Sequence, residues 1–142
     1  MTDALAIAAT GLQAYSRRME GSASNIANLT SRGAIAARDG TRPAADAPTP
    51  YQPLTTAQTD IRTGAGQGAG TRAYFRPSSA PVIAQYDPTD PLANKDGMVG
   101  APNVDEGAET VQQISARSAY QASARIARAS NEMMKSLMDM KA

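Results

Sequence analysis

The proline residues of this chain are confined to its middle. All nine lie between Pro43 and Pro102, so the first 42 residues and the last 40 contain none. A proline inside a helix costs about 3 kcal/mol, because it lacks an N–H and its ring clashes with the preceding turn. The distribution therefore predicts a helical segment over residues 1–33, an extended Pro/Gly-rich segment over 34–103, and a long second helix over 104–142.

The N-terminal segment carries a seven-residue repeat. Its large apolar members are Leu5, Leu12, Met19 and Ile26. Such a repeat keeps one stripe of a helix facing a partner helix when the two supercoil slightly. We expect the helix to end near Asn28, because asparagine bonds nearby backbone groups and tolerates the left-handed conformation. We expect Asn25 to bond the backbone of an adjoining segment or subunit.

The C-terminal segment carries an apolar stripe with helical spacing. Its members are Val111, Ile114, Ser118, Ala122, Ile126, Ala129, Met133, Leu137 and Met140. They advance by threes and fours, as one face of a helix does. A helix from about Val104 to Lys141 would be roughly 55 Å long at 1.5 Å per residue. A chain this small has no domain that could cover such a helix, so we expect the stripe to need partners.

Large apolar side chains are scarce. The 42 % hydrophobic content includes 29 alanines, whereas Leu, Ile, Val and Phe together number 18 of 142 residues. This share is below the level of roughly 20 % at which a core of normal size becomes doubtful. We therefore expect a chain that buries too little surface alone and completes its packing against other subunits. The methionines near the C-terminus suit such a surface, because thioethers adapt to varied neighbours.

The composition also limits the possible chemistry. The absence of cysteine and histidine excludes disulfides, thiol nucleophiles, imidazole bases and the usual structural zinc sites. A net charge of +1 gives no case for nucleic acid as a partner. The glycine run 64–70 lacks the context of a dinucleotide-binding loop, and the acidic residues over 87–97 lack the spacing of a calcium loop. We predict a protein that is not an enzyme and has no catalytic residue, cofactor, metal or small-molecule substrate.

Three stretches of the middle segment could form strands. They are Tyr51–Ile61, Gly70–Phe75 and Val82–Tyr86, and a turn is expected at Lys95–Gly97 because glycine accepts positive φ. We predict one short β-hairpin flanked by irregular chain. The expected fold class is mainly α, with two long terminal helices packed as a coiled-coil-like pair around a small β-rich middle.

Two parts of the chain resemble a known family. Ser24–Asn28, which reads S-N-I-A-N and is followed by Gly33, resembles a motif shared by the flagellar axial proteins. Residues 86–104 resemble the segment before the last helix in the FlgC family of flagellar basal-body rod proteins, and so do residues 117–122 and 133–135. The first motif indicates only the superfamily, whereas the longer segment indicates the particular family.

The resemblance implies a structural subunit of the proximal rod, in the periplasm, that transmits torque for motility. It also implies export by the flagellar type III system without a cleaved signal peptide. The partners would be other rod proteins, copies of this chain and the export apparatus. The residues expected at the assembly interface are Leu5, Leu12, Met19, Asn25, Ile26, Asn28, Val111, Ile114, Tyr120, Ile126, Met133, Leu137 and Met140. The alternative is a small helical adaptor that recruits a partner outside any polymer.

Overall fold

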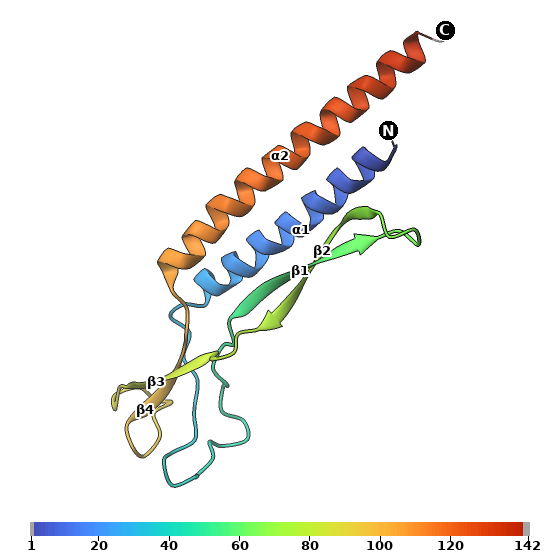
Figure 1. The fold of residues 1–142 in the computed structure, drawn as a ribbon. Helices are drawn as coiled ribbons and strands as arrows, with labels where there is room; N and C mark the ends of the chain where they lie inside the picture. The colour runs from blue at the N-terminus through green and yellow to red at the C-terminus, as the bar shows by residue number, and fades with distance from the viewer. Residues whose placement is uncertain (1, 141–142) are drawn as a thin grey trace. The chain divides into compact units, whose positions relative to one another are not determined.

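The computed structural model describes residues 2–140 of the chain. In chain order its elements are α1 (Thr2–Ala27), β1 (Leu54–Arg62), β2 (Gly68–Pro77), β3 (Val82–Tyr86), β4 (Met98–Pro102) and α2 (Glu106–Asp139). Figure 1 shows this order of a helix, a β-rich middle and a longer helix, which confirms the predicted fold class. The outer ends of the predicted segments, residue 1 and residues 141–142, lie outside the described residues.

Helix α1 stops at the asparagine expected to end it. The main-chain N–H and the side-chain Nδ2 of Asn28 both donate to the main-chain oxygen of Ser24, at 3.1 and 2.9 Å. The main-chain oxygen of Asn28 accepts hydrogen bonds from the main-chain N–H and the hydroxyl of Ser31. Asn28 therefore bonds both the last helical turn and the chain that follows it, which closes the helix.

Helix α2 begins at an aspartate cap. The carboxylate of Asp105 accepts from the main-chain N–H of Ala108 at 3.0 Å, which satisfies a donor that the first turn leaves unpaired. The helix continues through Gly107 and spans 34 residues, or about 51 Å at 1.5 Å per residue. None of the helices within residues 2–140 has a stretch long and apolar enough to cross a membrane.

The chain forms two compact units, and each long element contributes to both. The first unit contains the chain up to Gly21, Thr56–Phe75 and the chain from Thr110 onward. The second contains Ser22–Thr55 and Arg76–Glu109. The two units are described separately below.

In the first unit, the β1–β2 hairpin lies on α1. The hydroxyl of Thr10 donates to the main-chain oxygen of Ile7 at 2.7 Å and accepts from the main-chain N–H of Thr71 at 3.2 Å. Gly70 has φ +117°, and a Cβ there would overlap the Thr10 side chain. Only glycine combines this φ with so close an approach. The strand β2 is thus held to the helix by this close approach and by Phe75, whose ring lies against Gly21 and under the guanidinium of Arg17, 5.6 Å from the ring centroid.

In the second unit, β3 and β4 pair antiparallel with Ile83 opposite Ala101 and Gln85 opposite Val99. Gly33 adds a bridge on the other side of β4, exchanging main-chain hydrogen bonds of 3.0 and 2.8 Å with Gly100. Val99 is fully buried between these segments. The centre of this unit therefore consists of three extended backbone segments, in which β4 lies between β3 and the chain at Gly33.

The second hairpin corrects the sequence prediction, which gave one hairpin and left Met98–Pro102 irregular. Glycine and proline disfavour strands, and β4 contains Gly100 and Pro102. The structure needs the glycine, because a Cβ at Gly100 would lie 2.5 Å from Pro50 and 2.6 Å from Ile35. The close approach of distant chain therefore overrides the local preference.

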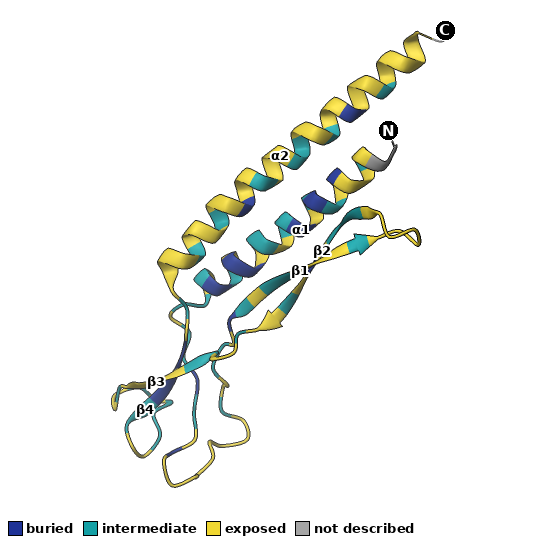
Figure 2. Cartoon of the chain, in the orientation of Figure 1, coloured by how far each residue is buried: buried dark blue, intermediate teal, exposed yellow. Residues whose placement is uncertain are grey.

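The buried core is small and consists largely of alanine. Among the described residues, the buried apolar ones are Ala8, Ala14, Ala37, Ala73, Val99, Ala101 and Ala116. Figure 2 shows that α2 is mostly exposed, whereas α1 carries more buried and intermediate residues. The two largest fully buried side chains are those of Val99 and Asn25. The side-chain amide of Asn25 is thus as completely buried as the largest buried aliphatic side chain, that of Val99.

Candidate functional site

The apolar stripe predicted on the C-terminal helix is exposed. Among its large members, the exposed fraction is 66 % for Val111, 65 % for Ile114, 54 % for Ile126, 52 % for Met133, 48 % for Leu137 and 81 % for Met140. We call the stripe Val111–Met140 defined above the open face of α2. Exposed apolar patches of this kind mark interaction surfaces more often than they mark monomer surface.

A different side of α2 meets α1. Ala116 and Ser130 are the buried residues of α2, and Ser123 between them lies against Gly11, where an added Cβ would be 3.0 Å from the serine hydroxyl. Arg18 also donates to the side-chain oxygen of Gln112 at 2.6 Å. Because higher numbers in α1 meet lower numbers in α2, the two helices run antiparallel along a seam of small residues.

The heptad residues of α1 do not lie over the open face of α2. Leu5, Leu12, Met19 and Ile26 are each half-buried. Leu12 lines a hollow together with Tyr120, which is 38 % exposed. The large apolar side chains of α2 stay exposed, so the heptad residues of α1 do not cover them within this chain.

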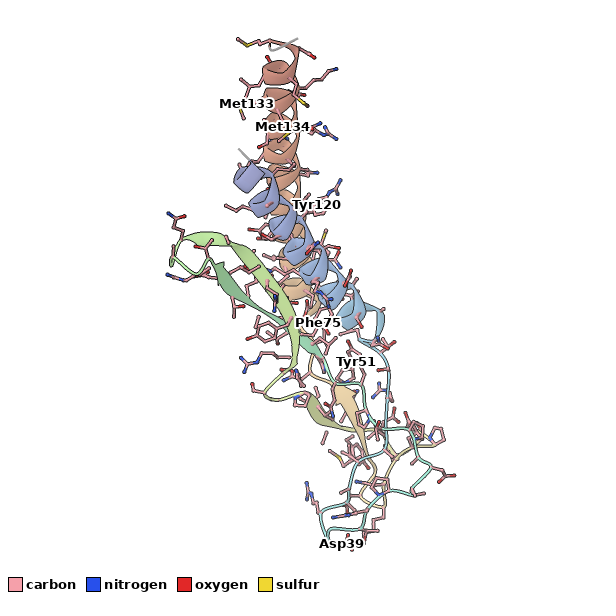
Figure 3. All side chains as sticks on the ribbon, turned by 90° about the vertical axis from the view of Figure 1, so that its right-hand side faces the viewer. Asp39, Tyr51, Phe75, Tyr120, Met133 and Met134 are labelled. Atoms are coloured by element: carbon pink, nitrogen blue, oxygen red, sulfur yellow. The ribbon has the colours of Figure 1, made fainter. Side chains whose placement is uncertain are left out.

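The methionines lie toward the C-terminal end of α2. Figure 3 labels Met133 and Met134 projecting from this part of the helix. Met134 is half-buried, whereas Met138 is 64 % exposed. The flexible thioethers of Met133 and Met140 give this end of the open face a deformable surface.

Asn25 lies at the centre of a polar junction in the second unit. Its Nδ2 donates to the main-chain oxygen of Leu54 at 2.9 Å and to Oε1 of Glu109 at 2.6 Å. Its Oδ1 accepts from the main-chain N–H of Leu54 at 2.8 Å and from the hydroxyl of Tyr51 at 3.0 Å. An asparagine amide has two N–H donors and two acceptor lone pairs, so Asn25, which is 1 % exposed, uses its full hydrogen-bonding capacity.

The sequence did not point to the partners of Asn25. Tyr51 was predicted only as the start of a strand, and Glu109 lies in a segment that was predicted only as helix. The hydrogen bond to Glu109 joins residues 84 positions apart in sequence, and no local pattern encodes such a pairing. The expected bond between Asn25 and the backbone of an adjoining segment is present, and it lies within this chain.

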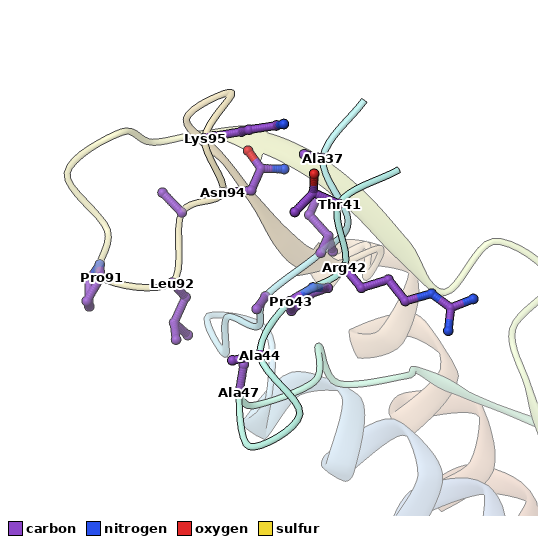
Figure 4. A pocket seen from close by; sticks show the side chains of 13 residues that line it. Ala37, Thr41, Arg42, Pro43, Ala44, Ala47, Pro91, Leu92, Asn94 and Lys95 are labelled. Carbon is purple, nitrogen blue, oxygen red and sulfur yellow. The ribbon is translucent and has the colours of Figure 1, made fainter. Parts of the chain in front are cut away.

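Asp39 and Lys95 form an ion pair in the loops of the second unit. Hydrogen bonds from Lys95 and then from Thr41 hold the pKa of Asp39 below its usual value of 3.8. Beside the pair is a hollow of about 290 Å³, shown in Figure 4, whose lining includes Leu92 and Arg42. Within residues 2–140, no group of three or more Asp, Glu, His or Cys side chains could hold a metal ion.

These features define a class of protein. Two antiparallel terminal helices flank two small hairpins, and the longer helix leaves its apolar side uncovered. Such an architecture is typical of a structural subunit rather than of a protein that binds a small ligand in a pocket.

Comparison with known proteins gives the family. The model of the flagellar basal body rod FlgEFG protein C-terminal region matches residues 95–140. The flagellar basal-body rod protein FlgC of Salmonella typhimurium is 34 % identical over 129 residues, covering 90 % of this chain and 88 % of that protein. The FlgC protein of Borreliella burgdorferi is 32 % identical over 140 residues, covering 93 % of this chain and 91 % of that protein. This chain belongs to the FlgC family of flagellar basal-body rod proteins.

Proposed function

We propose that this protein, which is a structural rod subunit of the flagellar basal body, assembles through its two terminal helices into the proximal rod. There it forms part of the axial shaft that transmits torque for motility. Its partners are copies of itself and other rod proteins. The observation that carries this proposal is the open face of α2, which holds six large apolar side chains that are exposed.

The free energy of assembly supports the role of this face. Burying a Val, Leu, Ile or Met side chain contributes about 1.5–3 kcal/mol relative to leaving it in water. Six such side chains on each copy supply roughly 10 kcal/mol before the cost of ordering them is subtracted. The large side chains of this face are not buried within the chain, whose core is small and mostly alanine. A neighbouring subunit would bury them.

The small size of the core also supports the proposal that the subunit is exported. We propose that the chain reaches the periplasmic part of the rod through the flagellar type III export apparatus, without a cleaved signal peptide. A chain whose buried apolar residues are mostly alanine unfolds at low cost, which suits passage through a narrow channel. The helices then gain stability from their neighbours in the rod.

The division of the chain follows the same logic. We propose that residues 1–33 and 104–142 form the assembling helical parts, whereas residues 34–103 form a Pro/Gly-rich extended segment with β-hairpin structure between them. The N-terminal interface residues Leu5, Leu12, Met19 and Ile26 are half-buried and retain surface for a neighbour. Asn25 and Asn28 act within the chain, by ending α1 and fixing the segment that follows.

A charged substitution on the open face tests the proposal. Ile114 is 65 % exposed, so Ile114→Asp should leave the isolated subunit folded while placing an unpaired charge in the assembled interface. Asn131→Asp is the matched control, because it adds the same charge at an exposed position of α2 outside the open face.

We expect Ile114→Asp cells to export the subunit, lack it in isolated basal bodies and fail to swim, whereas Asn131→Asp cells assemble rods and swim normally. Normal rod incorporation of both variants would contradict assembly through this face. Sedimentation at several protein concentrations distinguishes this proposal from the adaptor alternative. An adaptor forms a complex of fixed stoichiometry at every concentration, whereas a polymer subunit does not.

A further inference from the structure

The first compact unit carries a hollow between α1 and α2. It has a volume of about 390 Å³, and its lining includes Leu12 and Ser16 of α1 and Tyr120 of α2; we call it the Tyr120 hollow. Tyr120 and the open-face residue Ile126 each lie three residues from Ser123, whose side chain lies against α1. At 3.6 residues per turn, the two side chains point about 120° apart, on either side of that contact. The Tyr120 hollow and the open face therefore lie on different flanks of the α1–α2 pair.

The end of α2 extends beyond the described part of α1. Gly11 lies against Ser123, and the two helices run antiparallel with the same rise per residue. The start of α1 is therefore level with about residue 130 of α2, and Ser130 is the last buried residue of that helix. Met133 and Leu137 are exposed and lie past this point, where Figure 3 shows Met133. A neighbouring copy can contact them without separating α1 from α2.

Copies in a polar polymer meet through two different surfaces of the chain. When identical subunits all point the same way, each contact joins one surface of one copy to another surface of the next. Moving a copy sideways without rotating it turns its open face toward the flank of the next copy that carries the Tyr120 hollow. The hollow offers Leu12 and the ring of Tyr120 as apolar contacts. A single chain thus carries both halves of one contact, which makes a second copy the occupant of the hollow.

The charge beside the hollow depends on how far the second copy is displaced. Arg117 lies three residues before Tyr120, about one turn away, and is exposed. Neither Arg117 nor Glu132 forms an ion pair with another described residue. When Met133 and Leu137 lie on either side of Tyr120, the second copy is displaced along α2 by about fifteen residues, which is ~22 Å. The same displacement brings Glu132 level with Arg117, so opposite charges meet.

The other displacements are less favourable. Three neighbouring pairs of the open face consist of two large side chains, namely Val111/Ile114, Met133/Leu137 and Leu137/Met140. Entry of Leu137 and Met140 would bring Lys135 level with Arg117, and like charges at this distance repel. Entry of Val111 and Ile114 would bring Glu109, whose carboxylate already accepts from Asn25. Met133 and Leu137 are therefore the pair that fills the hollow and also places an exposed carboxylate beside Arg117.

We propose that the Tyr120 hollow of one copy receives Met133 and Leu137 of a second copy. Glu132 of the second copy then pairs with Arg117 of the first. Each chain carries both surfaces, so the contact can repeat from copy to copy and sets their displacement along the helix axis. The inference rests on the proposed function, because it names the partner that covers part of the open face.

Disulfide bonds between copies measure this displacement. The chain contains no cysteine, so engineered cysteines are its only thiols. Gln113 lies about two turns before Tyr120 on the same side of α2, and Ala129 is a small residue of the open face. At the proposed displacement, Ala129 of one copy lies one residue from the level of Gln113 in the next, so Gln113→Cys/Ala129→Cys should link neighbouring copies. Gln113→Cys/Ala122→Cys is the matched control, because Ala122 lies on the same face but about 9 Å from that level.

The amount of linked dimer per basal body is measured on non-reducing gels after mild oxidation of isolated basal bodies. Neither cysteine pair can form within one chain, because its members are more than two turns apart on the same helix. Every disulfide therefore joins two copies. We expect the first pair to give about tenfold more linked dimer than the control pair, since a disulfide requires Cβ atoms within about 4.5 Å of each other.

Charge reversal in the background of the linking pair tests the ion pair directly. Arg117→Glu and Glu132→Arg should each lower the amount of linked dimer about fivefold, because an attraction becomes a repulsion. The double variant Arg117→Glu/Glu132→Arg restores opposite charges and should return to within about twofold of the parent. Arg125→Glu is the control, because it reverses an exposed charge that lies level with the neutral Thr110 of the neighbouring copy, and it should leave the yield unchanged.

The outcomes separate this inference from the proposed function. Equal yields from the two cysteine pairs, single reversals that leave the yield unchanged, or a double reversal that fails to restore it each overturn the inference. Basal bodies that contain the chain but no linked copies also overturn it while leaving the proposed function intact, because the open face then contacts a different rod protein. Basal bodies that lack the parent chain overturn both.

Discussion

Replacing Asn25 with alanine removes four hydrogen bonds from a fully buried position. The N–H and C=O of Leu54 then lose their amide partner, and the carboxylate of Glu109 loses its donor. Leaving a buried polar group unpaired costs about 1–3 kcal/mol, and partial rehydration of the half-exposed groups reduces the sum. We expect the free energy of unfolding to fall by about 2–4 kcal/mol, against a total of about 5–15 kcal/mol for a native domain.

The aspartate variant tests the direction of the bonds. Asn25→Asp keeps nearly the same volume, but a carboxylate cannot donate to Leu54, and it faces the carboxylate of Glu109. The pKa of the new side chain should therefore rise above its unfolded value of about 3.9. The destabilisation relative to Asn25 is then fully present at neutral pH and shrinks as the pH falls through the raised pKa.

Urea denaturation followed by circular dichroism measures both effects. Asn131→Ala is the control, because Asn131 is exposed on α2 and surface changes of this kind usually stay within ~0.5 kcal/mol. If Asn25→Ala also stayed within that range, the hydrogen bonds of Asn25 would contribute no more than bonds to water. The argument that this amide organises the second unit would then be wrong.

Three further outcomes are expected. The isolated subunit should melt broadly at modest temperature, because its core is mostly alanine, and a sharp two-state calorimetric transition would contradict this. Gly70→Ala should destabilise the chain by about 1–3 kcal/mol, since φ is +117° and Thr10 occupies the space; Gly64→Ala, with open space around it, should not. Lys95→Met should raise the pKa of Asp39 toward 3.8 in an NMR titration, because Lys95 is the largest cause of its lowering, and an unchanged pKa would refute that cause.

The pair between Asp39 and Lys95 also defines a pH window. Because the folded pKa of Asp39 is lowered, the pair contributes above the unfolded pKa and its contribution is lost as the pH falls through the folded value. Both side chains are 52 % exposed, so solvent screens the pair and its effect on overall stability is small.

The sequence by itself determined the two terminal helices and the β-rich segment between them. The proline-free ends and their helical spacing predicted both helices, since proline is excluded from helix interiors and a stripe at threes and fours has one continuous apolar side. The end of α1 at Asn28 followed from local backbone chemistry. The strand Val82–Tyr86 was predicted within its observed bounds. Each of these features depends on residues close together in the chain.

Only the tertiary structure decided which surfaces meet. The stripe of large residues on α2 is evident in the sequence, yet the side that packs on α1 is the one with Ala116 and Ser130. The strand β4 forms around Gly100 because distant backbone approaches it. The bond between Asn25 and Glu109 joins positions 84 apart. Spacing along one helix gives its apolar side but not its neighbour, because contact depends on the three-dimensional position of groups that the local sequence does not contain.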